Sequence, residues 1–200
     1  MRVEDQTFVA TVGELRAMLQ FVSKDITRAY LHTLCFDFEH RRIAAADGHT
    51  LAVLQVIKGK VLAGEVHLVG ATNLNDLLKG SKPAAEVQLR FGSDASAGHQ
   101  ATFIGNCGQL APLSLVDAKF PPIEQVIPER LPGNWSGGAI CGFDSTYLAR
   151  LPVLRKAMSD GGGKSCQWRM QPPPDALSPT RFDWTVDGVE ALVVIMPVKI

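Results

Sequence analysis

The sequence predicts an α+β fold, because one order of elements, a strand, a helix and then further strands, occurs three times along the chain. The three occurrences begin near residues 7, 66 and 139, at intervals of roughly 60 to 75 residues, and such repetition is typical of a fold built from similar units. In each occurrence the spacing of apolar residues changes from the period of a strand to that of a helix and back. Three similar units are therefore expected.

The first unit is predicted to contain a strand at residues 7–10 and a helix over residues 11–22. Thr11 and Glu14 have the spacing of a capping box, in which each side chain satisfies a backbone donor at the start of a helix. One buried stripe is marked at helical spacing by Val12, Leu15, Leu19 and Val22. Strands are expected over residues 31–39, 42–46 and 50–57, with a polar turn at His40 and Arg41.

The second and third units follow the same order. The second is predicted to have a strand at residues 66–69, a short helix over Ala71–Leu78, and strands at 86–91 and 101–104. The third is predicted to have a strand at residues 139–143, a helix over 145–158, and strands at 166–170, 181–186 and 189–196. Pro152 has no backbone N–H, so it is expected to kink that helix or shift its start. Glycine and proline predict loops at residues 92–98, 161–164 and 172–179.

The composition is that of a soluble globular protein, with 46% hydrophobic and 20% charged residues. Twenty basic and twenty acidic residues give a formal net charge of zero, so any contact with DNA has to be local. Glu4, Asp5 and Glu14 interrupt the region where a signal peptide has its apolar core, and no segment approaches the ~20 apolar residues of a membrane span. These observations predict a cytoplasmic protein.

The four cysteines are expected to be buried and reduced. None belongs to a Cys-x-x-Cys pair, and each lies in or beside an apolar segment, where a free thiol behaves as a small apolar side chain. They are Cys35, Cys107, Cys141 and Cys166.

Two short motifs resemble catalytic or ligand-binding sequences. Asp47-Gly48-His49 has a carboxylate near an imidazole, but no second cluster of histidine and acid completes a ligand set, so a structural turn with positive φ at Gly48 is favoured. The segment Gly-Gly-Gly-Lys-Ser at residues 161–165 has Met158 where a phosphate-binding loop requires glycine, and it lies after a helix and before a strand, the reverse of the required order. Neither motif predicts a metal or a cofactor, and no catalytic residue is predicted.

Four segments resemble a known family. Residues 44–53 read Ala-Ala-Ala-Asp-Gly-His-Thr-Leu-Ala-Val and residues 194–200 read Val-Ile-Met-Pro-Val-Lys-Ile. They resemble the Asp-Gly-His-Arg-Leu-Ala turn and the Val-Met-Pro-Met-Arg-Leu tail of the β subunit of bacterial DNA polymerase III, the sliding clamp. Phe-Pro-Pro-Ile-Glu-Gln-Val-Ile-Pro at 120–128 resembles its inter-domain linker, and Gly-Phe-Asp-Ser-Thr-Tyr-Leu at 142–148 resembles the strand-to-helix entry of its last domain.

The resemblance implies the DNA clamp fold, with antiparallel sheets and short helices on one face. Residues 1–128 correspond to one complete clamp-like domain of two units, residues 129–200 to a half-domain, and the family's first domain has no counterpart. The implied function is that of a non-enzymatic replication processivity factor, which binds double-stranded DNA without sequence preference and tethers a DNA polymerase or another protein with a clamp-binding motif. The implied assembly is a homo-oligomer, either a dimer or a tetramer, that encircles DNA. One alternative is a solitary peptide-binding module or regulator that does not encircle DNA. An enzyme using Asp47 and His49 is ranked last.

The resemblance also implies a pocket for short peptides that carry a glutamine followed by apolar residues and a terminal Leu-Phe. Its residues would be Leu31, Gly48, His49, Leu51, Pro128, Tyr147, Val194, Met196 and Pro197. Methionine suits a surface that accepts varied peptides, because its unbranched side chain repacks easily. Two positions differ from the family pattern, since Thr50 and Lys199 replace arginines, so the peptide preference is open.

Contacts with DNA are expected from basic residues near the helices and from one loop that matches a DNA-facing loop of the family. The candidates are Lys24, Arg28, Tyr30, Lys79, Arg150, Arg155 and Lys156. Such residues would contact phosphates without reading sequence, as the inner helices of clamps do. The alternative for these side chains is an ordinary solvated surface.

Overall fold

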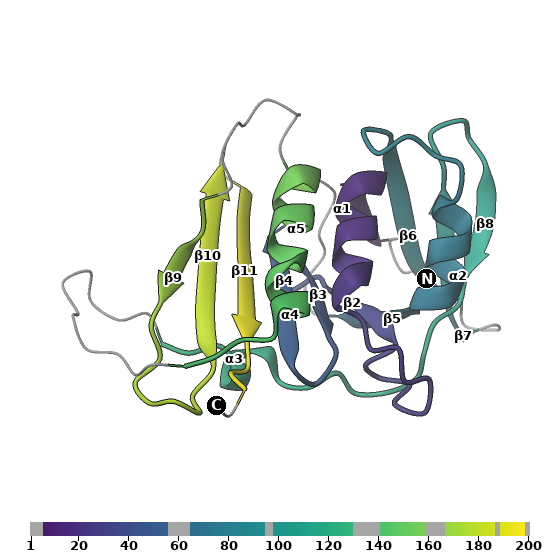
Figure 1. Cartoon of the computed structure of the whole chain (residues 1–200). Helices are drawn as coiled ribbons and strands as arrows, with labels where there is room; N and C mark the ends of the chain where they lie inside the picture. The colour runs from purple at the N-terminus through teal and green to yellow at the C-terminus, as the bar shows by residue number, and fades with distance from the viewer. Residues whose placement is uncertain are drawn as a thin grey trace.

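Two antiparallel sheets form the framework of the molecule, and the longer helices cover one face of them. The computed structural model describes residues 6–55, 65–94, 98–129, 141–158, 167–186 and 189–198. The smaller sheet has the strand order β1-β6-β7-β8, and the larger has the order β5-β2-β3-β4-β11-β10-β9. Helices α1, α2 and α5 lie on the same face (Figure 1). This arrangement confirms the predicted α+β fold with antiparallel sheets.

The first unit contains the predicted capping box between its first strand and its helix. It contains β1 (Gln6–Thr11), α1 (Val12–Met18), the 3₁₀ helix η1 (Leu19–Phe21), β2 (Thr33–Asp37), β3 (Arg42–Ala46) and β4 (Thr50–Gln55). Thr11 Oγ1 accepts from the Glu14 backbone N at 3.1 Å, and the Glu14 carboxylate accepts from the Thr11 backbone N at 2.6 Å. The helix ends earlier than predicted because its last turn tightens into η1 and Val22 is extended.

The second unit contains one strand that the sequence pattern did not reveal. Its elements are β5 (Val66–Gly70), α2 (Ala71–Leu78), β6 (Glu86–Asp94), β7 (Gly98–Ile104) and β8 (Leu110–Leu113). The bounds of α2 are those predicted. Strand β8 is short and contains Pro112, which is tolerated because β8 is the last strand of its sheet. Cys107 lies exposed in the turn before it, next to Gly108 at φ 75°, so the prediction that this thiol is buried was wrong.

In the third unit the predicted helix is divided into two. Its elements are α4 (Ser145–Leu148), α5 (Arg150–Met158), β9 (Arg169–Gln171), β10 (Thr180–Val186) and β11 (Val189–Ile195). Pro152 is in the first turn of α5, where a backbone N–H has no partner within the helix, so the proline shifted the helix start as expected. Of the predicted strand at 139–143, only residues 141–143 are described, and Gly142 forms a bridge with Val198. Cys166 and residues 161–164 lie outside the described residues.

Alternating side chains of the larger sheet supply two cores. Phe36 and Phe38 point towards the helices, where they pack with Phe8 and Phe91 at ring distances of 4.6 to 5.5 Å. The opposite face is covered by residues 116–127, which include the four-residue helix α3 (Ile123–Val126). That second core consists of Leu31, Cys35, Ala44, Ala46, Leu51, Val53, Leu68, Phe120, Ile123 and Val194.

The third unit continues the sheet of the first. Strand β11 pairs with β4, with Val194 opposite Leu51, and α5 packs beside α1 (Figure 1). Strand β11 therefore lies beside β4, which directly follows the loop that begins with Asp47. The division into domains at residue 128 stays a prediction. Among the described residues, no helix is both long and apolar enough to span a membrane.

Candidate peptide-binding pocket

The loop between β3 and β4 is a tight turn organised by one carboxylate. Asp47 Oδ1 accepts hydrogen bonds from the backbone N of His49 at 2.9 Å and of Thr50 at 2.7 Å. Gly48 has φ 93°, which a residue with a side chain rarely adopts. The predicted structural turn is confirmed. Among the described residues, no group of three or more His, Cys, Asp or Glu is arranged to hold a metal ion.

The segment after β11 lies against this turn. The Met196 backbone N donates to the His49 carbonyl oxygen at 2.9 Å, and the Val198 N donates to the Gly142 carbonyl oxygen at 2.9 Å. A pocket of about 280 Å³ opens between the turn, this segment and the linker that covers the second core. Its lining is Arg28, Tyr30, Leu31, Ala46, Gly48, His49, Thr50, Leu51, Phe120, Pro121, Ile123, Val126, Val194 and Met196.

Six of the nine predicted pocket residues are brought together in this lining. They are Leu31, Gly48, His49, Leu51, Val194 and Met196. The other three lie outside it. Tyr147 stacks on the His49 ring, with centroids 5.8 Å apart and planes at 16°. Pro197 directly follows Met196, and the Pro128 carbonyl accepts from Arg181 Nη1 at 3.2 Å.

Of the linker, sequence reasoning assigned only Pro128 to the pocket and missed the linker residues that line it. Phe120, Ile123 and Val126 are apolar although they belong to or adjoin a linker, and this apolar character could have predicted an apolar wall. Arg28 and Tyr30 were predicted to contact DNA, but their side chains border this pocket. The resemblance concerned the whole loop, so it could not distinguish residues that face DNA from residues that border the peptide pocket.

The pocket has an apolar floor, and both apolar and charged side chains lie at its mouth. Leu31, Leu51 and Val194 are buried, whereas Tyr30 and Met196 are 39% and 38% exposed. At the edge, the Arg28 Nε is 3.6 Å from the Asp25 carboxylate, and this ion pair contributes little because both side chains are exposed to solvent. An apolar floor with a few polar groups at its rim is typical of ligand sites. This geometry suits apolar side chains that are inserted from the surface.

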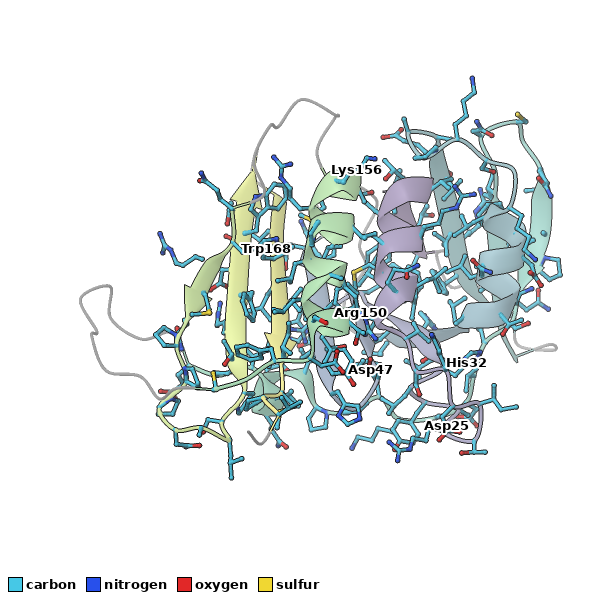
Figure 2. All side chains as sticks on the ribbon, in the orientation of Figure 1. Asp25, His32, Asp47, Arg150, Lys156 and Trp168 are labelled. Carbon is cyan, nitrogen blue, oxygen red and sulfur yellow. The ribbon has the colours of Figure 1, made fainter. Side chains whose placement is uncertain are left out.

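Arg150 is engaged with the turn rather than exposed on its helix. Its Nη1 donates to Asp47 Oδ2 at 2.6 Å and to Thr50 Oγ1 at 3.0 Å, and its Cζ lies 4.9 Å from the centre of the Tyr147 ring. Burial opposes ionisation of Asp47, but hydrogen bonds from Arg150, His49 and Thr50 outweigh it and hold the pKa of Asp47 below its ordinary value. Figure 2 shows the Arg150 and Asp47 side chains meeting where α4 and α5 join.

An ionic cluster fixes the linker on the other side of the pocket. Arg42 Nε donates to Asp37 Oδ2 at 2.8 Å, and the same guanidinium pairs with Glu124 of α3. The cluster lines a second cavity of about 580 Å³. Burial raises the pKa of the neighbouring Cys35 thiol to about 12, so the reactive thiolate is not formed at neutral pH.

The candidate DNA contacts are distributed over different parts of the molecule. Lys79 Nζ pairs with Asp76 at 2.7 Å, and Arg155 Cζ lies 6.0 Å from the centre of the Trp184 ring. Lys156 is exposed at one end of α5, whereas Lys24 is exposed next to Asp25 at the opposite end of the helix layer (Figure 2). The structure does not gather these side chains into one cluster.

Comparison with known proteins identifies the fold. No protein-family model and no curated protein sequence matches the chain. Among solved structures, a DNA polymerase III β-subunit candidate from Eubacterium rectale matches with a TM-score of 0.70 and 10% identity over 99% of this chain. A sliding clamp from Bartonella birtlesii bound to griselimycin matches with a TM-score of 0.66 and 19% identity over 98% of this chain. The β subunit from Thermotoga maritima matches with a TM-score of 0.62 and 16% identity over 100% of this chain.

The chain spans 66% of the length of the first two structures and 67% of the third. At these identities the likeness concerns the fold alone. The topology, the position of the turn beside β11 and these matches lead to one conclusion: the chain has the sliding-clamp fold of the DNA polymerase III β subunit, over a span equal to about two thirds of such a subunit.

Proposed function

We propose that the protein is a clamp-like, non-enzymatic processivity factor, which binds double-stranded DNA without sequence preference and tethers a DNA polymerase through a short peptide. The observation that carries this proposal is the pocket between the turn at Gly48 and the segment at Met196. Six of its lining residues are those expected from the sliding-clamp resemblance, and they come from segments far apart in the sequence. In support, one of the similar structures is a sliding clamp that holds a ligand, griselimycin.

The peptide test is a change at the mouth of the pocket. Met196→Asp is expected to weaken the binding of a peptide with a glutamine, apolar residues and a terminal Leu-Phe by more than about tenfold, because a few apolar anchors supply most of the energy of such contacts. Fluorescence anisotropy of the labelled peptide measures the affinity. Removing residues 196–200 is expected to have at least the same effect.

The matched control is Leu177→Asp, which adds the same charge at an exposed apolar residue between β9 and β10 that is not among the residues lining the pocket. It is expected to leave the peptide affinity unchanged. Equal affinity in the wild type and the Met196→Asp variant would show that the peptide binds elsewhere. A wild type that does not distinguish this peptide from its scrambled version would disprove the peptide-binding function.

A second candidate is a solitary peptide-binding module that does not encircle DNA. One observation favours it: cations on the helix side are already engaged within the chain. Arg16 Nη2 donates to the Leu78 carbonyl at 2.6 Å, Lys79 pairs with Asp76, and Arg150 pairs with Asp47. These three cations are therefore less available to attract DNA phosphates, and the net charge of the chain is zero.

Assembly separates the two candidates. Among the described residues, no strand pairs with the outer edges of β8 and β9, so each sheet ends in an edge that a second copy could extend. Since a two-fold contact uses the same surface of both chains, a dimer would continue the sheet across that contact, and two dimers would supply the six domains of a ring.

A ring is expected to remain on nicked circular DNA in salt that removes phosphate contacts, and to leave once the circle is cut. Light scattering over a concentration series gives the mass, and gel filtration of preloaded DNA gives the retention. Equal loss from circular and linear DNA by a monomer that still binds peptide would favour the solitary module.

A further inference from the structure

Arg150 connects the third unit to the turn that forms one wall of the pocket. It is the first residue of α5, and the carboxylate it reaches, that of Asp47, belongs to the first unit, 103 residues earlier. The two side chains are 20% and 11% exposed, so the pair is largely shielded from solvent. An ion pair with this geometry and little solvent is held more firmly than a surface pair.

The Asp47 carboxylate joins this contact to the backbone of the turn. Oδ2 accepts from Arg150, while Oδ1 accepts from the backbone N of His49 and of Thr50. The hydroxyl of Thr50 completes the set, because it donates to Asp47 Oδ1 and accepts from Arg150 Nη1, both at 3.0 Å. The position of the guanidinium is thereby coupled to the position of two pocket-lining residues.

A second route couples Arg150 to the same wall. Its guanidinium lies over the Tyr147 ring at 4.9 Å and over the Phe21 ring at 5.7 Å, and Tyr147 stacks on His49. Favourable contacts of a cation with aromatic faces occur within about 6 Å. Arg150 itself is not among the residues that line the pocket. Its influence on a bound peptide is therefore indirect.

Thr50 is the residue of the turn at which this chain differs from the sliding-clamp pattern. The sliding-clamp resemblance places an arginine at this position of the turn, where this chain has a short side chain. Arg150 brings a guanidinium to within 3.0 Å of that side chain from a different unit. The positive charge missing from the turn is thus supplied by α5.

We propose that Arg150 is a positioning residue of the peptide pocket, which holds the turn at residues 47–50 and the Tyr147 ring in the arrangement that admits a peptide. The proposal rests on the proposed peptide-binding function. It makes the third unit control the shape of a wall built by the first, without any contact between Arg150 and the peptide.

The test compares Arg150→Met, which removes the charge and keeps much of the length, with Arg150→Lys and Asp47→Asn. Arg150→Met and Asp47→Asn are each expected to weaken binding of the Leu-Phe peptide about tenfold, and the double variant is expected to be no weaker than either, because both changes break the same contact. Arg150→Lys is expected to recover part of the affinity, since lysine keeps the charge but not the planar fork.

A second measurement does not depend on the peptide. The imidazole proton signals of His49 are expected to shift in the NMR spectrum of Arg150→Met, because the ring loses its fixed position over Tyr147. The matched control is Arg90→Met, an exposed arginine of β6 in the other sheet, which is expected to change neither the affinity nor these signals. Thermal unfolding of each variant verifies that it is folded at the temperature of measurement.

The outcomes separate the inference from the proposed function. Wild-type affinity and unchanged His49 signals in Arg150→Met would overturn the positioning role. If that variant does not fold, the same two readings from Asp47→Asn decide. A wild type that binds no peptide would overturn the proposed function, and the His49 signals would still decide whether Arg150 positions the turn.

Discussion

Replacing Asp37 by alanine is expected to lower the free energy of unfolding by about 3 to 5 kcal/mol, because it leaves the buried Arg42 guanidinium without its buried charge partner. The Asp37 side chain is 5% exposed and that of Arg42 is 10% exposed. Glu124, the other partner of Arg42, is exposed and compensates only in part. Urea unfolding followed by circular dichroism measures the change, with the exposed Asp25→Ala as the control, expected to stay within about 0.5 kcal/mol.

The same contribution has a defined pH dependence. Burial opposes ionisation of Asp37, but hydrogen bonds from His40 and Arg42 outweigh it and lower its pKa below the ordinary value of 3.8. The carboxylate therefore stabilises the fold fully above pH 3.8 and loses this effect as the pH falls through the lower folded pKa. The difference between the wild type and Asp37→Ala should be constant near neutrality and shrink in acid. A difference that grows in acid would contradict the assignment.

Phe36→Ala is expected to cost about 3 to 5 kcal/mol, because it opens a cavity that the surrounding sheet and helices cannot fill. The Phe36 ring is fully buried, with its centre 5.3 Å from that of Phe8 and 5.5 Å from that of Phe91. These three residues join the two sheets beneath the helices, so the loss should affect the whole chain cooperatively.

Guanidinium unfolding followed by tryptophan fluorescence measures the cost of Phe36→Ala. Phe36→Leu should lose less, because leucine refills most of the space. Ile26→Ala, at a residue that is 75% exposed, should change the free energy of unfolding by less than about 0.5 kcal/mol. Equal losses at positions 26 and 36 would mean that the core is not organised around these rings.

The elements that the sequence predicted well are those whose signals are local. The capping box at Thr11 fixed the start of α1, the helical stripe gave the bounds of α2, and the glycine of the Asp47 turn indicated positive φ. Helix α3 was missed because it has only four residues and follows two prolines, too short for a periodic pattern.

In the candidate pocket, too, the residues with local signals were predicted and those that depend on distant contacts were not. The turn and the segment after β11 carry recognisable motifs, so most of their lining residues could be named beforehand. The role of Arg150 could not be predicted, because its partner Asp47 lies in another unit and a single sequence does not reveal which distant charges meet. For that reason Arg150 was predicted to contact DNA, whereas Asp47 was interpreted as part of a structural turn.

The pairing of β4 with β11 has a consequence for the order in which the molecule can be built. Strand β11 is made after β4 and after strands β5 to β10, so this ladder closes a long loop of the chain. Contacts between such distant segments form late, because the loop entropy has to be overcome before they contribute energy. On the ribosome, the wall of the pocket that contains Val194 is absent until β11 has emerged, so a nascent chain presents the turn at Gly48 without the surface that completes it.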